Sequence, residues 1–140
     1  MLEQFATEGV LDFVYHIGDL SYAVGYSSVW DDYLEMIAPF ASRVGYGVNL
    51  GNHEFNWPAA GFKGRAVQSF YTGYDSGGEC GVPAQRLLPM PQGESKAARG
   101  GGFDKPWWSL DVGLVHVVAM CTELDFREGK SLRHSTPRVL

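Results

Sequence analysis

The sequence lacks a long hydrophobic run. No apolar stretch approaches the roughly 20 consecutive residues that an α-helix needs to cross a bilayer, so we expect no membrane segment in this chain. Glu3, Gln4 and Glu8 follow Met1 where a signal peptide would carry a basic region and an apolar region. No signal peptide is therefore expected, and the sequence itself does not indicate a compartment.

Basic residues and cysteines are also scarce. The chain has 11 Lys and Arg against 16 Asp and Glu, with a net charge of -5. This balance argues against a nucleic-acid partner, because nucleic-acid binding normally needs a clustered basic face. Cys80 and Cys121 belong to no CxxC motif, which excludes a zinc knuckle or a thioredoxin-like pair. They could form a disulfide or remain two separate thiols.

Glycine, in contrast, is abundant. The chain of 140 residues contains 18 Gly and 7 Pro, and 45% of its residues are hydrophobic. A chain of this length forms one domain that buries roughly two thirds of its unfolded surface, and this composition indicates short elements joined by loops. Residues 57–106 are rich in Gly and Pro, and we expect them to form long, ordered loops that cover a site.

Apolar patterns predict a βαβ unit near the start of the chain. The runs LDFVYHI (residues 11–17) and YGVNL (46–50) are short, apolar and followed by glycine, as is typical of buried strands. Apolar residues spaced three and four apart over 30–41 predict a helix between them. The order of strand, helix and strand predicts parallel strands whose carboxyl ends meet at one edge of a sheet.

Further elements are predicted on either side of this unit. Residues 2–9 indicate a short helix that stops at Gly9, and 107–120 indicate a β-hairpin with Gly113 in its turn. For the central helix, Ser27 or Ser28 is the expected N-cap, with Asp31 and Asp32 in the first turn. The last residues, 128–140, have no apolar pattern and are predicted to form a tail.

Polar side chains suited to a metal follow both predicted strands. Asp19 ends HIGD, with Tyr22 three residues later, and the tetrad GNHE places Asn52, His53 and Glu54 directly after the second strand. Carboxylate and amide oxygens suit hard cations, and an imidazole can act as a general acid. Each motif alone is also typical of an ordinary polar turn. Their expected position at one sheet edge favours a metal site, where Glu54 could orient the imidazole of His53.

The two motifs resemble those of a known family. GDLSY and GNHE match the blocks GDxxY and GNH(D/E) of the purple acid phosphatases, within the calcineurin-like metallophosphoesterases. Flanking sequences such as SGGECGVP and VHVVAMCTELDF are similar to those of the plant-type members, so the resemblance covers about residues 11–127. It implies an α/β fold, a partial metallophosphoesterase sandwich in which a βαβ unit precedes long loops and a hairpin. Residues 1–127 would form part of the catalytic domain.

The resemblance also implies roles for individual residues. Asp19 would bridge two metal ions, Tyr22 would bind the ferric ion as a phenolate, and Asn52 would bind the divalent partner ion. His53, with Glu54, would contact the phosphate or protonate the leaving group. The implied cofactor is a binuclear centre of Fe(III) with Zn, Mn or Fe(II), and the implied substrate is a phosphate monoester. Members of this family are commonly secreted or vacuolar.

Three of the five family blocks have no counterpart in the chain. The DxG block would lie before Met1, and the VxxH and GHxH blocks would lie after the matched region. His116 aligns with a structural strand of the family, and His134 lies in the predicted tail, so neither replaces the missing histidines. We expect a fragment of an acid phosphatase whose isolated chain is inactive. The alternative is a non-catalytic, truncated chain.

Other chemistry-bearing residues are predicted to be structural. His16 lies inside an apolar strand and is expected to be a hydrogen-bonded core histidine, and Trp57, Trp107 and Trp108 are expected to pack in the core or loops. The glycines at 100–102 open no helix after a strand, so they do not predict a phosphate-binding loop.

Overall fold

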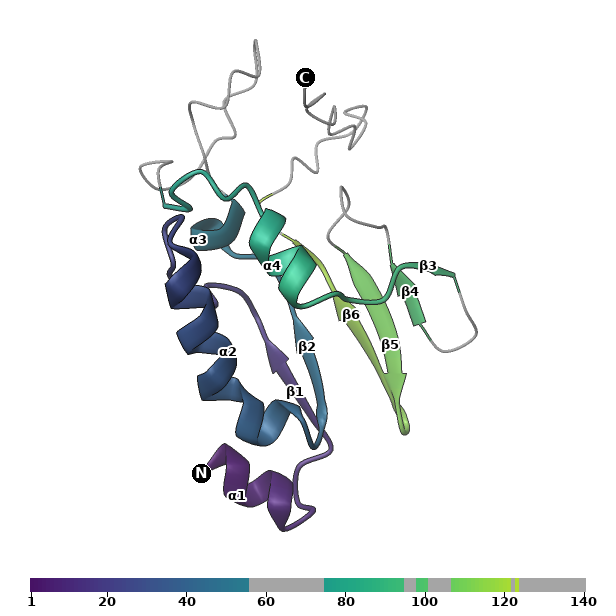
Figure 1. The fold of residues 1–140 in the computed structure, drawn as a ribbon. Coiled ribbons are helices and arrows are strands. Elements are labelled where there is room, and N and C mark those ends of the chain that lie inside the picture. Colours follow the sequence, from purple (N-terminus) through teal and green to yellow (C-terminus); the bar gives the residue numbers. More distant parts are fainter. Residues whose placement is uncertain (56–74, 95–97, 101–106, 122, 124–140) are drawn as a thin grey trace.

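The first half of the described structure is a parallel βαβ unit. The computed structural model describes residues 1–55, 75–94, 98–100, 107–121 and 123 (Figure 1). β1 (Phe13–His16) pairs with β2 (Gly45–Val48) in parallel register, and α2 (Ser27–Ala41) connects them along one side of the pair. α1 (Leu2–Thr7) precedes them and ends before Gly9, which adopts a positive φ of 69°. The predicted βαβ unit and its parallel pairing are confirmed.

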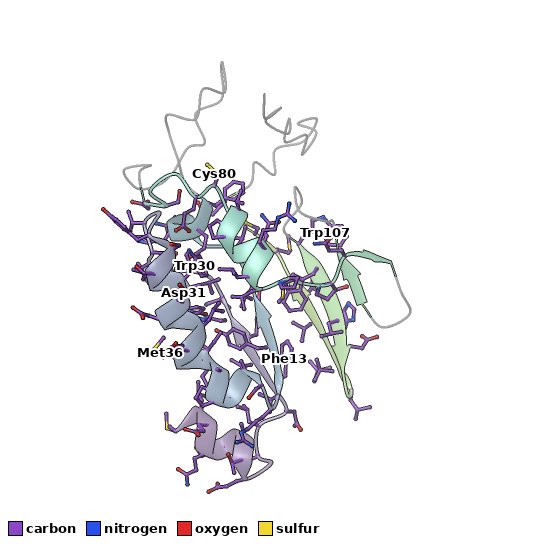
Figure 2. The ribbon with its side chains drawn as sticks, viewed as in Figure 1. Phe13, Trp30, Asp31, Met36, Cys80 and Trp107 are labelled. Atoms are coloured by element: carbon purple, nitrogen blue, oxygen red, sulfur yellow. The ribbon has the colours of Figure 1, made fainter. Side chains whose placement is uncertain are left out.

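α2 packs through the apolar face that its sequence predicts. Trp30, Tyr33 and Ile37 are buried on it, whereas Met36 on the opposite side is 67% exposed (Figure 2). The predicted cap is wrong, because the N-cap is Tyr26, which makes no capping hydrogen bond with its side chain. The first turn consequently starts at Ser27 and contains no acidic residue, so the two aspartates lie beyond it.

The second half of the chain forms an antiparallel sheet. β5 (Trp108–Val112) and β6 (Val115–Ala119) pair as the predicted hairpin, with Gly113 in its turn at a φ of 59°. β3 (Gly93–Glu94) and β4 (Ala98–Gly100) extend this sheet in the order β3-β4-β5-β6. The expectation of loops alone over 57–106 is therefore wrong for these strands and for α4 (Val82–Leu87). Such short elements carry too few residues to show a period.

One tryptophan connects the two sheets. Trp108 of β5 is 2% exposed, and its indole N–H donates a hydrogen bond of 2.8 Å to the backbone oxygen of Val48. Its ring also meets Tyr15 of β1 edge to face, with centroids 5.5 Å apart. Beyond β6, Cys121 is buried and directs its thiol to the oxygen of Leu50 at 3.7 Å. The core reading of Trp108 is confirmed, while Trp57 lies outside the described residues.

The described residues thus form a small α/β structure with one principal core. Its buried apolar members come from β2, α2, α3 (Asn52–Phe55), α4 and the loops after the strands: Leu20, Ala23, Trp30, Tyr33, Ile37, Val48, Leu50, Phe55, Ala84 and Cys121. Among these described parts, no helix has the length and apolar character needed to cross a membrane. The predicted tail over 128–140 lies outside the described residues.

Candidate metal centre

The ends of β1 and β2 bring the two sequence motifs together. The backbone N–H of His53 lies 3.3 Å from Oδ1 of Asp19, which it can reach because only a short connection separates β2 from α3 (Asn52–Phe55). Asp19 has a φ of 55°, a left-handed conformation that aspartate tolerates better than most residues. A Cβ at Gly51 would lie 2.6 Å from the backbone nitrogen of Asp19, so only glycine permits this approach. The prediction that Asp19 lies close to the GNHE motif is confirmed.

Tyr22 joins the same group of side chains. Its hydroxyl donates to Oδ2 of Asp19 at 3.3 Å, and its ring lies 4.3 Å from that of His53, measured between centroids. The negative charge of Asp19 raises the pKa of the Tyr22 hydroxyl above its ordinary value, because ionisation would place two anions side by side. The side chain is 53% exposed and accessible from solvent.

Glu54 fixes the two strand ends relative to each other. It is 1% exposed, and its carboxylate accepts hydrogen bonds from the backbone N–H groups of Asp19, Leu20 and Gly51 at 2.7 to 3.0 Å. Burial raises the pKa of this carboxyl group, although the three N–H donors act in the opposite direction. Glu54 therefore acts as a buried clamp between the loops.

His53 has a different environment from the one expected. No hydrogen bond between Glu54 and the imidazole of His53 occurs among the described residues, and Nδ1 of His53 is buried without a partner within them. A buried ring nitrogen normally has a hydrogen-bond partner or a ligand. The ring of His53 lies beside that of Tyr22, so this nitrogen is compatible with a ligand that the described residues do not provide.

Asp75 is a member of the site that sequence reasoning missed. Nδ2 of Asn52 donates a hydrogen bond of 2.9 Å to Oδ2 of Asp75, although the two residues lie far apart in the sequence. Asp75 precedes the Gly-rich stretch SGGECG, where an isolated carboxylate resembles any polar turn residue. No pattern in the sequence indicates this contact, because it arises from the return of the chain to the end of β2.

Several alternative candidates have structural roles. His16 forms hydrogen bonds through Nδ1 with the hydroxyl groups of Tyr46 at 2.8 Å and Tyr33 at 3.2 Å, so the expected core histidine is confirmed. Burial lowers the pKa of this imidazole, which favours its neutral form. His116 lies on the hairpin and pairs with Asp111 there. Cys80 and Cys121 are both free thiols, so the structure contains no disulfide between them.

The chemistry of the gathered side chains fits a hard metal ion. Asp19, Tyr22 and Asn52 offer a carboxylate, a phenol and an amide oxygen, and such oxygen donors suit ferric and divalent first-row ions. The part of the chain that the structure describes contains no group of three or more His, Cys, Asp or Glu side chains arranged to bind a metal. A metal ion held by these three side chains would therefore need further ligands from outside the described residues.

Comparison with known proteins finds purple acid phosphatases among the relatives of this chain. No family model matches the chain. A protein of Arabidopsis thaliana named probable inactive purple acid phosphatase 27 is 46% identical over 130 residues, which are 93% of this chain and 19% of that protein. A nucleotide pyrophosphatase/phosphodiesterase of Hordeum vulgare is 39% identical over 118 residues, or 84% of this chain and 28% of that protein.

A solved structure supports these matches. The purple acid phosphatase from yellow lupin (Lupinus luteus) seeds superimposes with a TM-score of 0.70 and 40% identity, covering 94% of this chain and 20% of that protein. The chain therefore spans about a fifth of the length of these phosphatases. With relatives of this identity in sequence and in structure, the chain is homologous to purple acid phosphatases and corresponds to a fragment of their catalytic domain.

Proposed function

We propose that the chain is part of an enzyme that hydrolyses phosphate monoesters at a binuclear metal centre. One observation carries the proposal: the parallel pairing of β1 and β2 holds the carboxylate of Asp19 within 3.3 Å of the backbone of His53. The two family motifs thereby form one site instead of two separate turns. Asp19, Tyr22 and Asn52 are the proposed ligands, and Fe(III) with Zn, Mn or Fe(II) is the proposed pair of ions.

Each of these residues has a separate proposed role in the hydrolysis. When bound, the metal pair supplies positive charge for the phosphate and lowers the pKa of a water nucleophile. Asp19 would help to hold the ions with its carboxylate, and Tyr22 and Asn52 would each contribute one oxygen. His53 stands beside them and can donate a proton to the oxygen of the leaving group. Glu54 holds the two loops in place by accepting three hydrogen bonds from their backbone.

A second substrate class has support from one relative. The Hordeum vulgare protein is named a nucleotide pyrophosphatase/phosphodiesterase, so phosphodiesters and pyrophosphates are an alternative to monoesters. Both classes need the same attack on phosphorus and differ in the group that the substrate pocket must hold. The names of four Arabidopsis relatives include the word inactive, which favours the non-catalytic alternative.

The proposal is tested by supplying the rest of the ligand set. The chain replaces the corresponding segment of the lupin phosphatase, and hydrolysis of an aryl phosphate monoester is measured beside that of an aryl phosphodiester, with ferric iron and Zn or Mn added. We expect turnover of the monoester. His53→Ala should lower kcat by about 100-fold or more, as is typical of the loss of a general acid.

The isolated chain serves as the comparison. It should show little turnover, since a water nucleophile needs a complete and rigid ligand set. A folded, metal-loaded chimera without hydrolase activity would contradict the proposed function. Preferential turnover of the diester would instead support the second substrate class, and purple colour with robust turnover from the isolated chain would contradict the expectation of an incomplete site.

A further inference from the structure

The contact between Asn52 and Asp75 determines which atom of the amide faces the site. Nδ2 of Asn52 donates to Oδ2 of Asp75 at 2.9 Å. A carboxylate can only accept hydrogen bonds, so the opposite orientation of the amide would place two acceptors against each other. The NH₂ group must therefore face Asp75. Because the amide is planar, its oxygen then points away from the carboxylate.

The amide oxygen remains available for another partner. Within the described parts of the chain, Oδ1 of Asn52 accepts no hydrogen bond. Asn52 starts α3 directly after the loop that contacts Asp19, and His53 beside it contacts the carboxylate of Asp19 through its backbone. This oxygen thus belongs to a residue that is adjacent in the chain to the contact between His53 and Asp19.

The loop that carries Asp75 is firmly attached to both strand ends. The backbone N–H of Gly81 donates to the oxygen of Glu54 at 2.7 Å. The carboxylate of Glu79, which is 8% exposed, accepts from the backbone of Gly25 at 2.9 Å and from the indole of Trp30 at 3.0 Å. These contacts hold residues 75–81 against the βαβ unit, so Asp75 has a fixed position from which to orient a neighbour.

We propose that Asp75 is a positioning residue that holds the amide of Asn52 with its oxygen directed at the metal. This inference rests on the proposed function, because it takes Asn52 to be a ligand. A side chain that hydrogen-bonds a ligand from behind removes its rotational freedom, and loss of such a partner typically lowers metal affinity 10- to 100-fold. Asp75 affects metal affinity entirely through Asn52, so its effect on the affinity should depend on the presence of Asn52.

The test is a double-mutant cycle with Mn²⁺ as the probe, on the full 140-residue chain. Mn²⁺ affinity is obtained from the paramagnetic broadening of NMR signals in the unsubstituted chain, Asp75→Ala, Asn52→Ala and the double variant. We expect Mn²⁺ to broaden the side-chain amide signals of Asn52. Asp75→Ala should raise the Kd for Mn²⁺ by about 10-fold, and it should have no further effect once Asn52 is alanine.

Other outcomes overturn the proposal. Asp75 would be a direct ligand or a purely structural residue if Asp75→Ala raised the Kd equally in both backgrounds, and it would have no role if the Kd did not change. Unbroadened Asn52 signals would exclude Asn52 as a ligand of the probe. Asp12→Ala removes an exposed carboxylate of the same type and should leave the Kd unchanged, which makes it the matched control.

A measurement on the unsubstituted chain covers the case in which the variant does not fold. The hydrogen bond should shift one side-chain amide proton of Asn52 downfield and slow its exchange with water, and Asp75→Asn should reduce both effects. If neither proton is shifted or protected in the unsubstituted chain, the contact and the proposal are wrong. Failure of the chimeric enzyme to hydrolyse phosphate esters would contradict the proposed function and leave the coupling between Asp75 and Asn52 intact.

Discussion

A single carboxylate has a large influence at the scale of residues. Glu54 is 1% exposed and accepts three backbone hydrogen bonds from the loops that follow β1 and β2. Glu54→Gln would turn an NH₂ group toward these N–H donors, and such a mismatch in a buried site costs about 2 to 4 kcal/mol. We expect the free energy of unfolding to fall by this amount in urea denaturation.

An exposed glutamate provides the comparison for this prediction. Glu35 lies on the solvent side of α2, so Glu35→Gln should change the free energy of unfolding by about 0.5 kcal/mol or less. Similar losses for the two variants would mean that Glu54 does not clamp the loops.

The two thiols should differ in reactivity. Burial raises the pKa of the Cys121 thiol to about 11, whereas Cys80 is only partly buried. At pH 8 we expect a disulfide reagent such as DTNB to modify Cys80 first and Cys121 only after unfolding, because the thiolate is the reactive form. Equally fast modification of both would contradict the buried position of Cys121.

The same thiol contributes to the pH dependence of stability. Its pKa rises on folding from an ordinary value of 9.0 to about 11, so the folded chain retains a proton that the unfolded chain loses in this range. The contribution is fully present below pH 9 and is lost as the pH rises through 11. Cys121→Ala should therefore lose less stability than the unsubstituted chain between pH 8 and pH 11.

Sequence patterns could predict most of the candidate site at this scale. Asp19, Tyr22, Asn52 and His53 lie next to strand ends, and neighbouring parallel strands bring such residues together regardless of loop detail. The contact of Asp75 with Asn52 depends on how the chain returns after a long connection. Neither periodicity nor spacing carries this information, so the contact required a structure.

At the scale of elements, the start of α2 can be improved. Tyr26 occupies the N-cap position with a φ of -93° and a ψ of 111°, the extended conformation of a capping residue, but it provides no side-chain hydrogen bond. Tyr26 is 70% exposed, so its replacement disturbs little packing. Tyr26→Asp should raise the free energy of unfolding by about 1 kcal/mol through a new cap.

Ser28→Ala supplies the control for the cap. Ser28 was an expected cap but lies inside the helix, so its replacement should be neutral or slightly stabilising. If Ser28→Ala destabilised the chain by as much as a lost cap would, the assigned start of α2 would be wrong.

Elements with a sustained period were predictable and short elements were not. α2 is 15 residues long and repeats its apolar face over four turns, which revealed both its extent and its buried side. α4 has six residues and β3 has two, so neither completes enough of a period to differ from a loop. Their conformation depends on contacts of α4 with α3 and of β3 with β4, and these contacts are a property of the folded chain.

At the scale of the whole molecule, Trp108 couples the two sheets. It is 2% exposed and donates to the backbone of Val48, while neighbouring Trp107 is 38% exposed (Figure 2). Trp108→Phe removes the hydrogen bond and part of the buried ring, which should destabilise the chain by about 2 to 3 kcal/mol. Trp107→Phe should cost well under 1 kcal/mol. Equal losses in urea denaturation would contradict the special position of Trp108.

The attachment of residues 75–81 to the site has an evolutionary consequence. The connection that follows Phe55 returns to a position secured by the hydrogen bonds of Asn52 with Asp75 and of Gly81 with Glu54. Insertions and deletions between two such anchored ends are inexpensive, because doubling the length of a loop costs only about 0.6 kcal/mol in closure entropy. Selection could therefore vary the length and composition of residues 56–74 among descendants of one ancestor while the metal-binding positions stayed in place.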